Sequence, residues 1–462
     1  MKYLEATLTK FNEIINNGKC NALAKRCELV KRSSSRLQGY EFAQAMMLPN
    51  GFIESETLNS LATRMHKINK NCNLSASALA QRINSPAAEN FMKACFEETL
   101  REIVKKEFDN ESLKLEIFSS FKRVLIQDST RAELNEKLSS TFKGTGGAAS
   151  KASLKIDFIF DYLSEESVDV SFCAGSKPDQ SLAKRIINFL REDDLLIRDL
   201  GYFSVGNLIE VEKKGASHIS RWKVNEDVYE SREAKEPVDL AKYIRKNMFN
   251  GIFDKEMFVG KQRHCVRMVA CEVSEGVVNK RLRDANRDAK RRGTKMSAKK
   301  EGLLKLSIFV TNVPVKILSG EVVMALYRVR WRIELIFKQW KSCMNLHVFK
   351  GYNTHRIHCL LYARLVMLLL IGKIYPILMK YALDRGRELS SYKLTNYLLA
   401  DHNFANALQS GRMDRFIDQL LTDILRRLCM DKRKRQSLRS SAKMGKGYDN
   451  KLTMNDLQKN AA

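Results

Sequence analysis

The sequence has few features of a secreted protein or of one built around structural metal. Its ten cysteines are scattered, without a C-x-x-C pair and without a grouping of cysteine and histidine that would suit zinc. This pattern is typical of reduced, mostly buried thiols and predicts a cytoplasmic protein. Residues 1–5 begin a mixed helical pattern and lack the apolar stretch of a signal peptide.

Long uncharged apolar runs are also missing. The most apolar stretch, residues 360–378, contains Arg364 and Lys373, which leave only residues 365–372 uncharged between them. A membrane-spanning helix needs about 20 largely apolar residues. We therefore expect a buried helix in this stretch and no membrane partner.

Acidic residues are scarce relative to basic ones. The chain has 80 Lys and Arg against 53 Asp and Glu, which gives a formal net charge of +27. Such an excess favours a polyanionic partner, because basic side chains that neutralise phosphates release condensed counterions. Nucleic acid is the leading candidate, and an anionic membrane surface is the second.

At 462 residues the chain is long enough for two to four compact units. Residues 1–115 are rich in helix formers and predict a helical region whose basic residues could hold DNA phosphates. Residues 376–462 predict a helical C-terminal region that ends in a polar tail after Asp431.

The pattern between these two regions predicts a mixed α/β layer. An apolar run ends at Asp128, and a second one, residues 194–198, is followed by Asp199. Two segments with period-2 alternation lie between them, and we expect their polar residues, including Asp157, Asp161 and Asp169, to form a solvated face. The remaining elements predicted here are helices at 182–190 and 203–214 and a strand at 219–224.

Residues 226–303 interrupt the α/β pattern. Residues 266–273 predict a strand, and residues 280–300 carry a dense run of positive charge. We interpret this segment as a β-rich insertion with a basic arm. A further strand, 304–310, and a long helix, 321–345, follow it.

One stripe of the long helix combines the side chains that phosphate chemistry requires. Tyr327, Arg330, Glu334 and Lys341 fall within an arc of roughly 60° at the helical period. A carboxylate can hold a divalent cation, and the flanking side chains can grip phosphates. The alternative is an ordinary surface helix in which Arg330 and Glu334 form an i,i+4 salt bridge.

The spacing of these four residues, Tyr-x2-Arg-x3-Glu-x6-Lys, resembles the signature of bacterial DDE transposases of the insertion-sequence-four type. The resemblance implies a ribonuclease-H-like mixed-sheet catalytic core, here residues 116–225 and 304–375. It also implies one catalytic Asp on the first strand, one after the fourth strand, and the Glu on a later helix.

Two aspartates match this plan. Asp128 follows an apolar strand and precedes Ser129-Thr130, and Asp199 precedes Leu-Gly-Tyr-Phe, as the family pattern implies. The competing residues are Asp194, which opens its strand, and the acids of the expected solvated face. Ligands of open α/β sheets bind at strand carboxyl ends, which favours Asp128 and Asp199.

The resemblance implies an enzyme that cuts and rejoins DNA with two Mg²⁺ ions, for which Mn²⁺ could substitute, held by Asp128, Asp199 and Glu334. Tyr327, Arg330 and Lys341 would hold phosphates, and Arg221 is a further candidate. The implied partners are double-stranded DNA, as terminal repeats and target, and a second copy of the chain bound through its C-terminal helices.

Cut-and-paste transposition through a DNA hairpin is implied by the same resemblance. Relatives that form hairpins stack a flipped base on an aromatic side chain, but the strand before the Glu helix offers only Phe309. Two alternatives stay open at this point: a catalytically silent DNA-binding inhibitor, and a ribonuclease-H-like nuclease without strand transfer.

Overall fold

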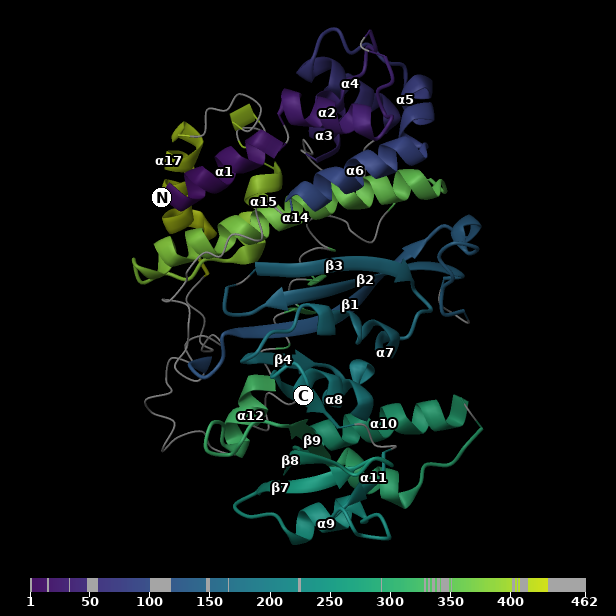
Figure 1. Ribbon diagram of the computed structural model, residues 1–462, viewed down its shortest axis with the longest axis vertical. Helices are drawn as coiled ribbons and strands as arrows, with labels where there is room; N and C mark the ends of the chain where they lie inside the picture. The colour runs from purple at the N-terminus through teal and green to yellow at the C-terminus, as the bar shows by residue number, and fades with distance from the viewer. Residues whose placement is uncertain are drawn as a thin grey trace.

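The structure is a computed structural model that describes most of residues 2–430. The residues outside the description are 1, 15, 33, 48–56, 100–117, 147–149, 165, 223–225, 292, 328–329, 331–332, 335–336, 339–340, 342–348, 350, 401–403, 405, 408–413 and 431–462. The predicted polar tail and much of the predicted 321–345 helix lie among them. Figure 1 shows helices at one end of the long axis, a sheet in the middle, and an extension of that sheet at the other end.

Five strands form the part of the sheet that carries the candidate site. β1 (Arg123–Leu134) pairs antiparallel with β2 (Ala152–Asp161), which pairs antiparallel with β3 (Glu166–Ala174). On its other side β1 pairs parallel with β4 (Asp194–Arg198), which pairs parallel with β5 (Ser217–Arg221). The order β3-β2-β1-β4-β5 with these directions is the ribonuclease-H-like arrangement, so the predicted fold class is confirmed.

The parallel pairing of β1 with β4 brings two acid-bearing segments together. The last paired residues are Gln127 and Arg198, so Asp128 and Asp199 follow at the same level of the sheet. β1 nevertheless continues to Leu134 through its pairing with β2. The prediction that Asp128 ends its strand is therefore wrong: Asp128 marks the point where parallel pairing with β4 ends.

The strands beyond β5 extend the same sheet. β9 (Leu306–Thr311) pairs antiparallel with β5 and with β8 (His264–Glu272), and β7 (Ile252–Val259) and β6 (Val228–Tyr229) follow outward. The nine described strands thus form one continuous sheet, which crosses the limits expected for an insertion at 226–303. The division into domains stays a prediction.

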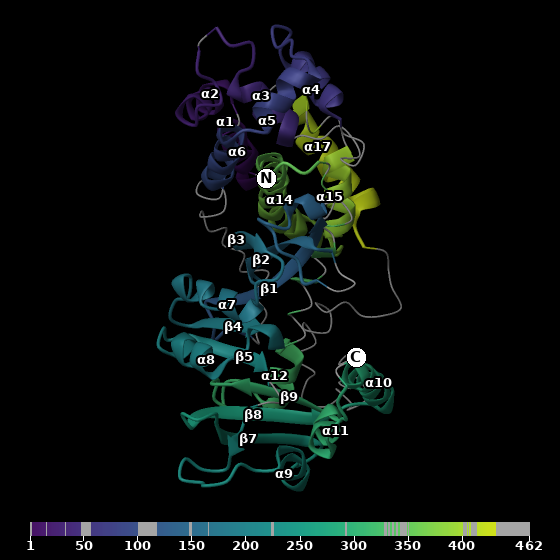
Figure 2. The same cartoon turned by 90° about the vertical axis from the view of Figure 1, so that its right-hand side faces the viewer.

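Three helices accompany the extension. α9 (Leu240–Lys246) and α11 (Ala298–Leu304) bury Leu240, Ile244 and Leu303 in an apolar cluster with β7, β8 and β9. α10 (Glu275–Arg291) covers most of the predicted basic arm and buries only Val277. The arm is therefore a regular helix that lies beside the start of β9 (Figure 2).

A long apolar helix, α14 (Thr354–Leu383), is the buried helix expected from the sequence. In length and composition α14 would suffice to cross a membrane, but 83% of its apolar 18-residue segment is buried inside the structure. α1 (Lys2–Ile14), α3 (Gly39–Met47) and α6 (Pro86–Thr99) pack on it, and β3 lies against another side (Figures 1 and 2). Contacts within the chain therefore account for its apolar character.

The other described helices are short. They are α2 (Asn17–Arg26), α4 (Leu58–Ile68), α5 (Ala76–Ile83), α7 (Asp179–Leu182), α8 (Val205–Glu212), α12 (Gly320–Tyr327), α15 (Ser391–Ala400) and α17 (Asp414–Asp423). The helix predicted at 182–190 is wrong in extent, because α7 ends at Leu182 and a separate 3₁₀ turn covers Arg185–Asn188.

The polar face of β2 is buried, which contradicts the prediction of a solvated face. Lys155 and Asp157 are fully buried, and Asp161 is 5% exposed. Asp157 accepts hydrogen bonds from Tyr202 at 2.8 Å, from Arg185 at 2.8 Å and from the amide of Gln127. Period-2 alternation reveals that the two faces of a strand differ in polarity, but whether the polar face reaches water depends on what covers it.

Replacing Asp157 by Ala should strongly destabilise the protein. The change leaves the Arg185 guanidinium and the Tyr202 hydroxyl without their buried carboxylate, a loss that typically costs about 3–5 kcal/mol. We expect a clearly lower melting temperature in a thermal unfolding scan.

Glu136→Ala is the matched control for this prediction. Glu136 is 63% exposed and pairs only with the exposed Lys151, and surface pairs of this kind contribute at most about 1 kcal/mol. Equal melting temperatures for the two variants would contradict a structural role for the buried polar layer.

Candidate active site

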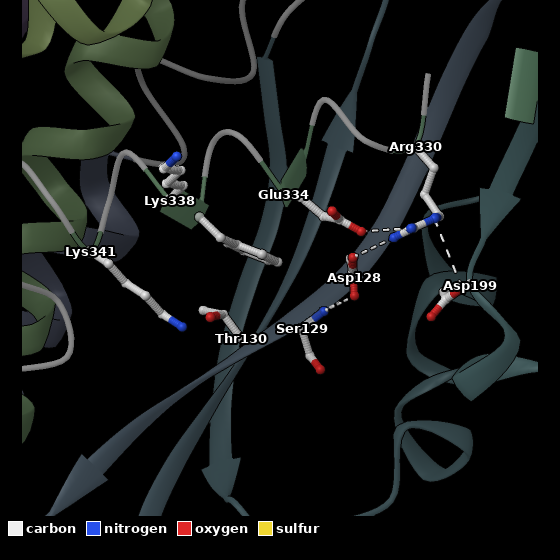
Figure 3. Close-up of a pocket in the computed structure, with 9 residues that line it drawn as sticks. Asp128, Ser129, Thr130, Asp199, Arg330, Glu334, Lys338 and Lys341 are labelled. Carbon is white, nitrogen blue, oxygen red and sulfur yellow. Dashed lines mark hydrogen bonds and ion pairs between the residues drawn. The ribbon is translucent and has the colours of Figure 1, made fainter. Parts of the chain in front are cut away.

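A pocket of about 660 Å³ opens where β1, β4 and the chain after α12 meet. β1 contributes Asp128, Ser129 and Thr130, and Asp199 follows β4. The side chains after α12 that line it are Arg330, Glu334, Phe337, Lys338 and Lys341. The structure therefore brings the three predicted acids and two of the four predicted phosphate ligands into one cavity (Figure 3).

Arg330 lies between the three acids. Its Nη1 donates to Asp128 Oδ2 at 3.1 Å, its Nη2 donates to Glu334 Oε1 at 2.6 Å, and its Nε is 3.9 Å from Asp199 Oδ1 (Figure 3). The hydroxyl of Tyr327 donates to the same Asp199 oxygen at 3.1 Å. The Arg330–Glu334 pair thus belongs to a cluster with both aspartates and is more than an isolated surface salt bridge.

Burial and neighbouring negative charge act together on Asp128. Burial raises the pKa of Asp128 to about 7, the guanidinium of Arg330 and the N–H of Ser129 oppose this rise, and the charges of Asp199 and Glu334 add to it. An ionised Asp128 is therefore disfavoured in the fold near neutral pH. A positive charge brought into the pocket would stabilise the ionised form of Asp128.

The remaining predicted residues lie at the edges of this cluster. Lys341 lines the pocket, and burial lowers its pKa. Arg221 is the last residue of β5, half-buried and outside the pocket lining, and its positive charge acts on Tyr327. Phe309 packs on the Tyr327 ring with centroids 4.8 Å apart and is 7% exposed, so its ring is not open to a flipped base.

The competing acids are held elsewhere. Asp194 pairs with Arg123 at 2.5 Å, Asp157 and Asp169 both pair with Arg185, and Asp161 accepts the N–H of Val124. None of them lines the pocket. These acids are engaged inside the protein, and those of β2 and β3 do not form the solvated face that the sequence predicts.

A second layer of residues, which the sequence pattern did not reveal, supports the acids. Asp179, at the start of α7, accepts a hydrogen bond from Ser129 Oγ at 2.9 Å and one from Lys155 Nζ at 2.7 Å. Its other oxygen lies against Gly201, where an added Cβ would be 3.0 Å away. Asp179 therefore touches the residue after Asp128 and the turn after Asp199.

No local signal marks Asp179 in the sequence. It follows Pro178 in a short polar segment, and its role depends on strands β1 and β2 and on the turn after β4, which are distant along the chain. The alternation in β2 places Lys155 on the predicted solvated face for a similar reason, since the pattern within the strand does not reveal its partner on α7.

The donor chemistry of the pocket suits a hard divalent cation, because three carboxylates supply only oxygen. In this structure the carboxylates close on the Arg330 guanidinium, and within the described part of the chain no three metal-binding side chains stand in ligand geometry. The three carboxylates are suitable ligands for such a cation, but in this structure the Arg330 guanidinium lies between them.

The strand order and the three converging acids define an enzyme of the ribonuclease-H-like class, which acts on phosphodiester bonds of nucleic acid. A family model described as "Transposase DDE domain" matches residues 119–370, more than half of the sequence, and the chain belongs to this family. Its members are metal-dependent enzymes that cleave and transfer DNA strands.

The chain is similar to curated transposases along most of its length. It is 28% identical over 425 residues to the transposase for insertion sequence element IS231B of Bacillus thuringiensis subsp. berliner, covering 88% of this chain and 86% of that protein. It is 25% identical over 390 residues to the transposase for IS1151 of Clostridium perfringens, with coverages of 81% and 80%. The predicted resemblance to bacterial transposases of the insertion-sequence-four type is confirmed.

A solved structure is also similar. It is the piggyBac transposase synaptic complex with hairpin DNA, at a TM-score of 0.46 and 12% identity, covering 94% of this chain and 87% of that one.

Replacing Asp128 by Asn should stabilise the metal-free protein at alkaline pH. The pKa of about 7 lies above the ordinary value of 3.8, so the folded state loses stability as pH rises from about 4 to 7 and carries the full penalty above that range. The amide has no such penalty. With EDTA present, we expect the variant to melt at least about 2 °C higher than the wild type at pH 8, with a smaller difference at pH 5.

Glu334→Gln is the control for this comparison, because the Glu334 side chain is 40% exposed. Its effect on melting should be smaller and less dependent on pH. Parallel pH profiles for Asp128→Asn and the wild type would show that burial does not oppose ionisation of Asp128.

Replacing Asp179 by Asn should slow DNA cleavage without weakening DNA binding. The change leaves buried Lys155 without its carboxylate and loosens the contact to Ser129, and losing such a supporting group typically costs about 10–100-fold in activity or metal affinity. Cleavage rates at saturating DNA and Mn²⁺ binding without DNA would measure this effect.

Ser181→Ala is the matched control in the same short helix, since Ser181 donates only to the Pro178 carbonyl. It should cleave like the wild type. If Asp179→Asn also cleaves and binds Mn²⁺ like the wild type, Asp179 has no positioning role.

Proposed function

We propose that this protein is an active transposase that binds the terminal repeats of an insertion sequence and cuts and rejoins their DNA by cut-and-paste transposition. The observation that carries the proposal is the convergence of Asp128, Asp199 and Glu334 on a single guanidinium in an open pocket. Family membership and the similarity to insertion-sequence transposases support the same reaction.

Asp128, Asp199 and Glu334 would hold two Mg²⁺ ions, for which Mn²⁺ could substitute. Bound there, the ions would activate the attacking oxygen and stabilise the leaving oxygen of a phosphodiester. The carboxylates must then release Arg330, whose hydrogen bonds to Asp128 and Glu334 would be replaced. A released Arg330 is well suited to a phosphate, because its planar fork binds two oxygens at once.

The other side chains of the site position the DNA. Tyr327 donates to Asp199, and Lys341 extends toward Thr130 on the side of Glu334 that faces away from Arg330 (Figure 3). Lys341 is suited to a phosphate that flanks the reacting bond. Arg221, next to Tyr327, extends the positive surface away from the acids.

The reaction proceeds by two kinds of attack on phosphorus. Water first cleaves one strand at the element end and frees a 3′-hydroxyl. That hydroxyl attacks the opposite strand to form a hairpin, and the reopened end later attacks the target DNA. The hairpin step is taken from the family resemblance stated above, and the buried position of Phe309 means that any aromatic stacking partner must be another residue.

The regions of the chain outside the pocket have roles in the same reaction. Residues 1–115 bind the element end, residues 226–303 form the insertion, and residues 376–462 join two copies of the chain in the DNA complex. We propose a bacterial, cytoplasmic protein, consistent with the Bacillus and Clostridium relatives.

Two other functions are possible for a protein with this site, and measuring DNA cleavage and joining distinguishes them. A silent DNA-binding inhibitor is disfavoured because all three acids and the Tyr-Arg-Lys set are present in the pocket region. A nuclease without strand transfer would use the same acids but would leave only cut ends.

Glu334→Gln should abolish strand cleavage and leave DNA binding intact. The amide preserves shape but removes one of the carboxylates that would hold the metal, so we expect at least about a 100-fold loss of cleavage of labelled element-end DNA with Mg²⁺. The products are resolved on a denaturing gel, together with joined products from added target DNA.

Glu321→Gln in the first turn of α12 is the matched control, because Glu321 is exposed and lies outside the pocket. Equal cleavage by the wild type and Glu334→Gln would remove Glu334 from the active site. Binding without cleavage by both would favour the inhibitor, and cleavage without joined products would favour the nuclease.

A further inference from the structure

The basic helix α10 has a charged face that the active site does not use. Five basic residues fall within an arc of roughly 100° at the helical period, and all five are exposed. They are Lys280, Arg283, Arg287, Lys290 and Arg291. Asp284 borders this stripe and pairs with Arg287, while Glu275 and Asp288 lie farther off it. The outward face therefore carries five basic residues and one neighbouring acid, a strong excess of positive charge.

The helix is fixed in place by its inner side. Arg281 points away from the stripe and donates to the carbonyls of Leu304 at 3.2 Å and Leu306 at 2.9 Å and to Ser307 Oγ at 3.1 Å. Val277 is buried beside it. Because the start of β9 holds α10, the basic stripe is presented as a rigid surface, and binding would not have to order a flexible arm.

Arg221 connects this helix to the catalytic pocket. Its charge acts on Arg281 at the inner side of α10 and also on Tyr327, which donates to Asp199. β5 and β9 bring this about, because Arg221 is paired with Phe309, which packs on Tyr327. Arg221 therefore lies between Tyr327, at the edge of the pocket, and the inner side of α10.

The far end of the stripe is also open. A cavity of about 570 Å³ lies between α10 and α11, and the charged residues that line it are Lys290, Lys295 and Glu301. From Lys280 to Arg291 the stripe extends about 16 Å, a length over which a duplex carries on the order of ten phosphate charges. The face therefore has the length and charge for several consecutive phosphate contacts.

We propose that the outward face of α10 binds the sugar–phosphate backbone of the element-end duplex whose scissile phosphate occupies the pocket. This inference rests on the proposed function and assigns a DNA-binding surface to the insertion. The contacts are to phosphates, so they add affinity and register without reading sequence.

The test replaces Lys280, Arg283, Arg287 and Arg291 together by Gln, which keeps side-chain length and helix propensity. Binding to labelled element-end duplex is measured from 50 to 300 mM salt, together with cleavage rates over a range of DNA concentrations. We expect roughly tenfold or more weaker binding at physiological salt and a salt slope smaller by about 3–4, near 0.9 per lost contact. Cleavage should fall at low DNA concentration and recover at saturation.

The matched control removes the same charge elsewhere. Lys122, Lys151, Lys213 and Lys242 are 65–85% exposed and pair only with surface acids, and their Gln quadruple should bind and cleave like the wild type. Thermal unfolding checks that both variants fold. A single Arg283→Gln variant, expected to lower the salt slope by about 1, replaces the quadruple if that variant is unstable.

Two results would overturn the inference. In the first, the α10 variant binds the element end with the affinity and salt slope of the control. In the second, binding and cleavage are normal and only joining to target DNA is lost, which would assign the face to target DNA. If the wild type binds the duplex but never cleaves it, the proposed function fails, and the salt slopes still decide what α10 does.

Discussion

Repulsion among three carboxylates in one pocket is the constraint on which the rest of the site depends. Asp128, Asp199 and Glu334 come from three distant segments, and burial makes the charge of Asp128 costly. In this structure Arg330 offsets that cost by lying between all three. The same position makes Arg330 a competitor for a metal ion, so Asp128, Asp199 and Glu334 would have to release Arg330 in order to hold one.

Holding such acids close together requires a rigid support. The buried side of β2 supplies part of it, since Lys155 and Asp157 connect to α7 and to the turn after β4 through hydrogen bonds inside the protein. A polar network of this kind is stable only when its members are paired, and each lost partner is expensive. Asp179 occupies the point where this network meets both aspartate-bearing segments.

The continuous sheet links chemistry to DNA binding. Because β9 pairs with β5, the chain that leaves the ribonuclease-H-like strands returns beside Arg221 and then leads into α12 and the pocket. The same strand anchors α10 through Arg281. One antiparallel pairing thus fixes Tyr327 on one side and a basic helix on the other, so the insertion is built into the catalytic sheet.

Most of the described strands, several helices and the three acids that meet in the pocket follow from local patterns in the sequence, whereas β6, β7, α9 and α11 do not. Apolar runs and the Tyr-Arg-Glu-Lys spacing depend on periods within single elements, and those periods are set by local backbone geometry. Four features depend on the tertiary fold: the burial of β2 on its polar side, the continuation of β1 beyond Asp128, the contacts of Asp179 with the site, and the attachment of α10 to the start of β9. These outcomes depend on which elements cover or pair with one another, and a period within one element carries no information about its neighbours.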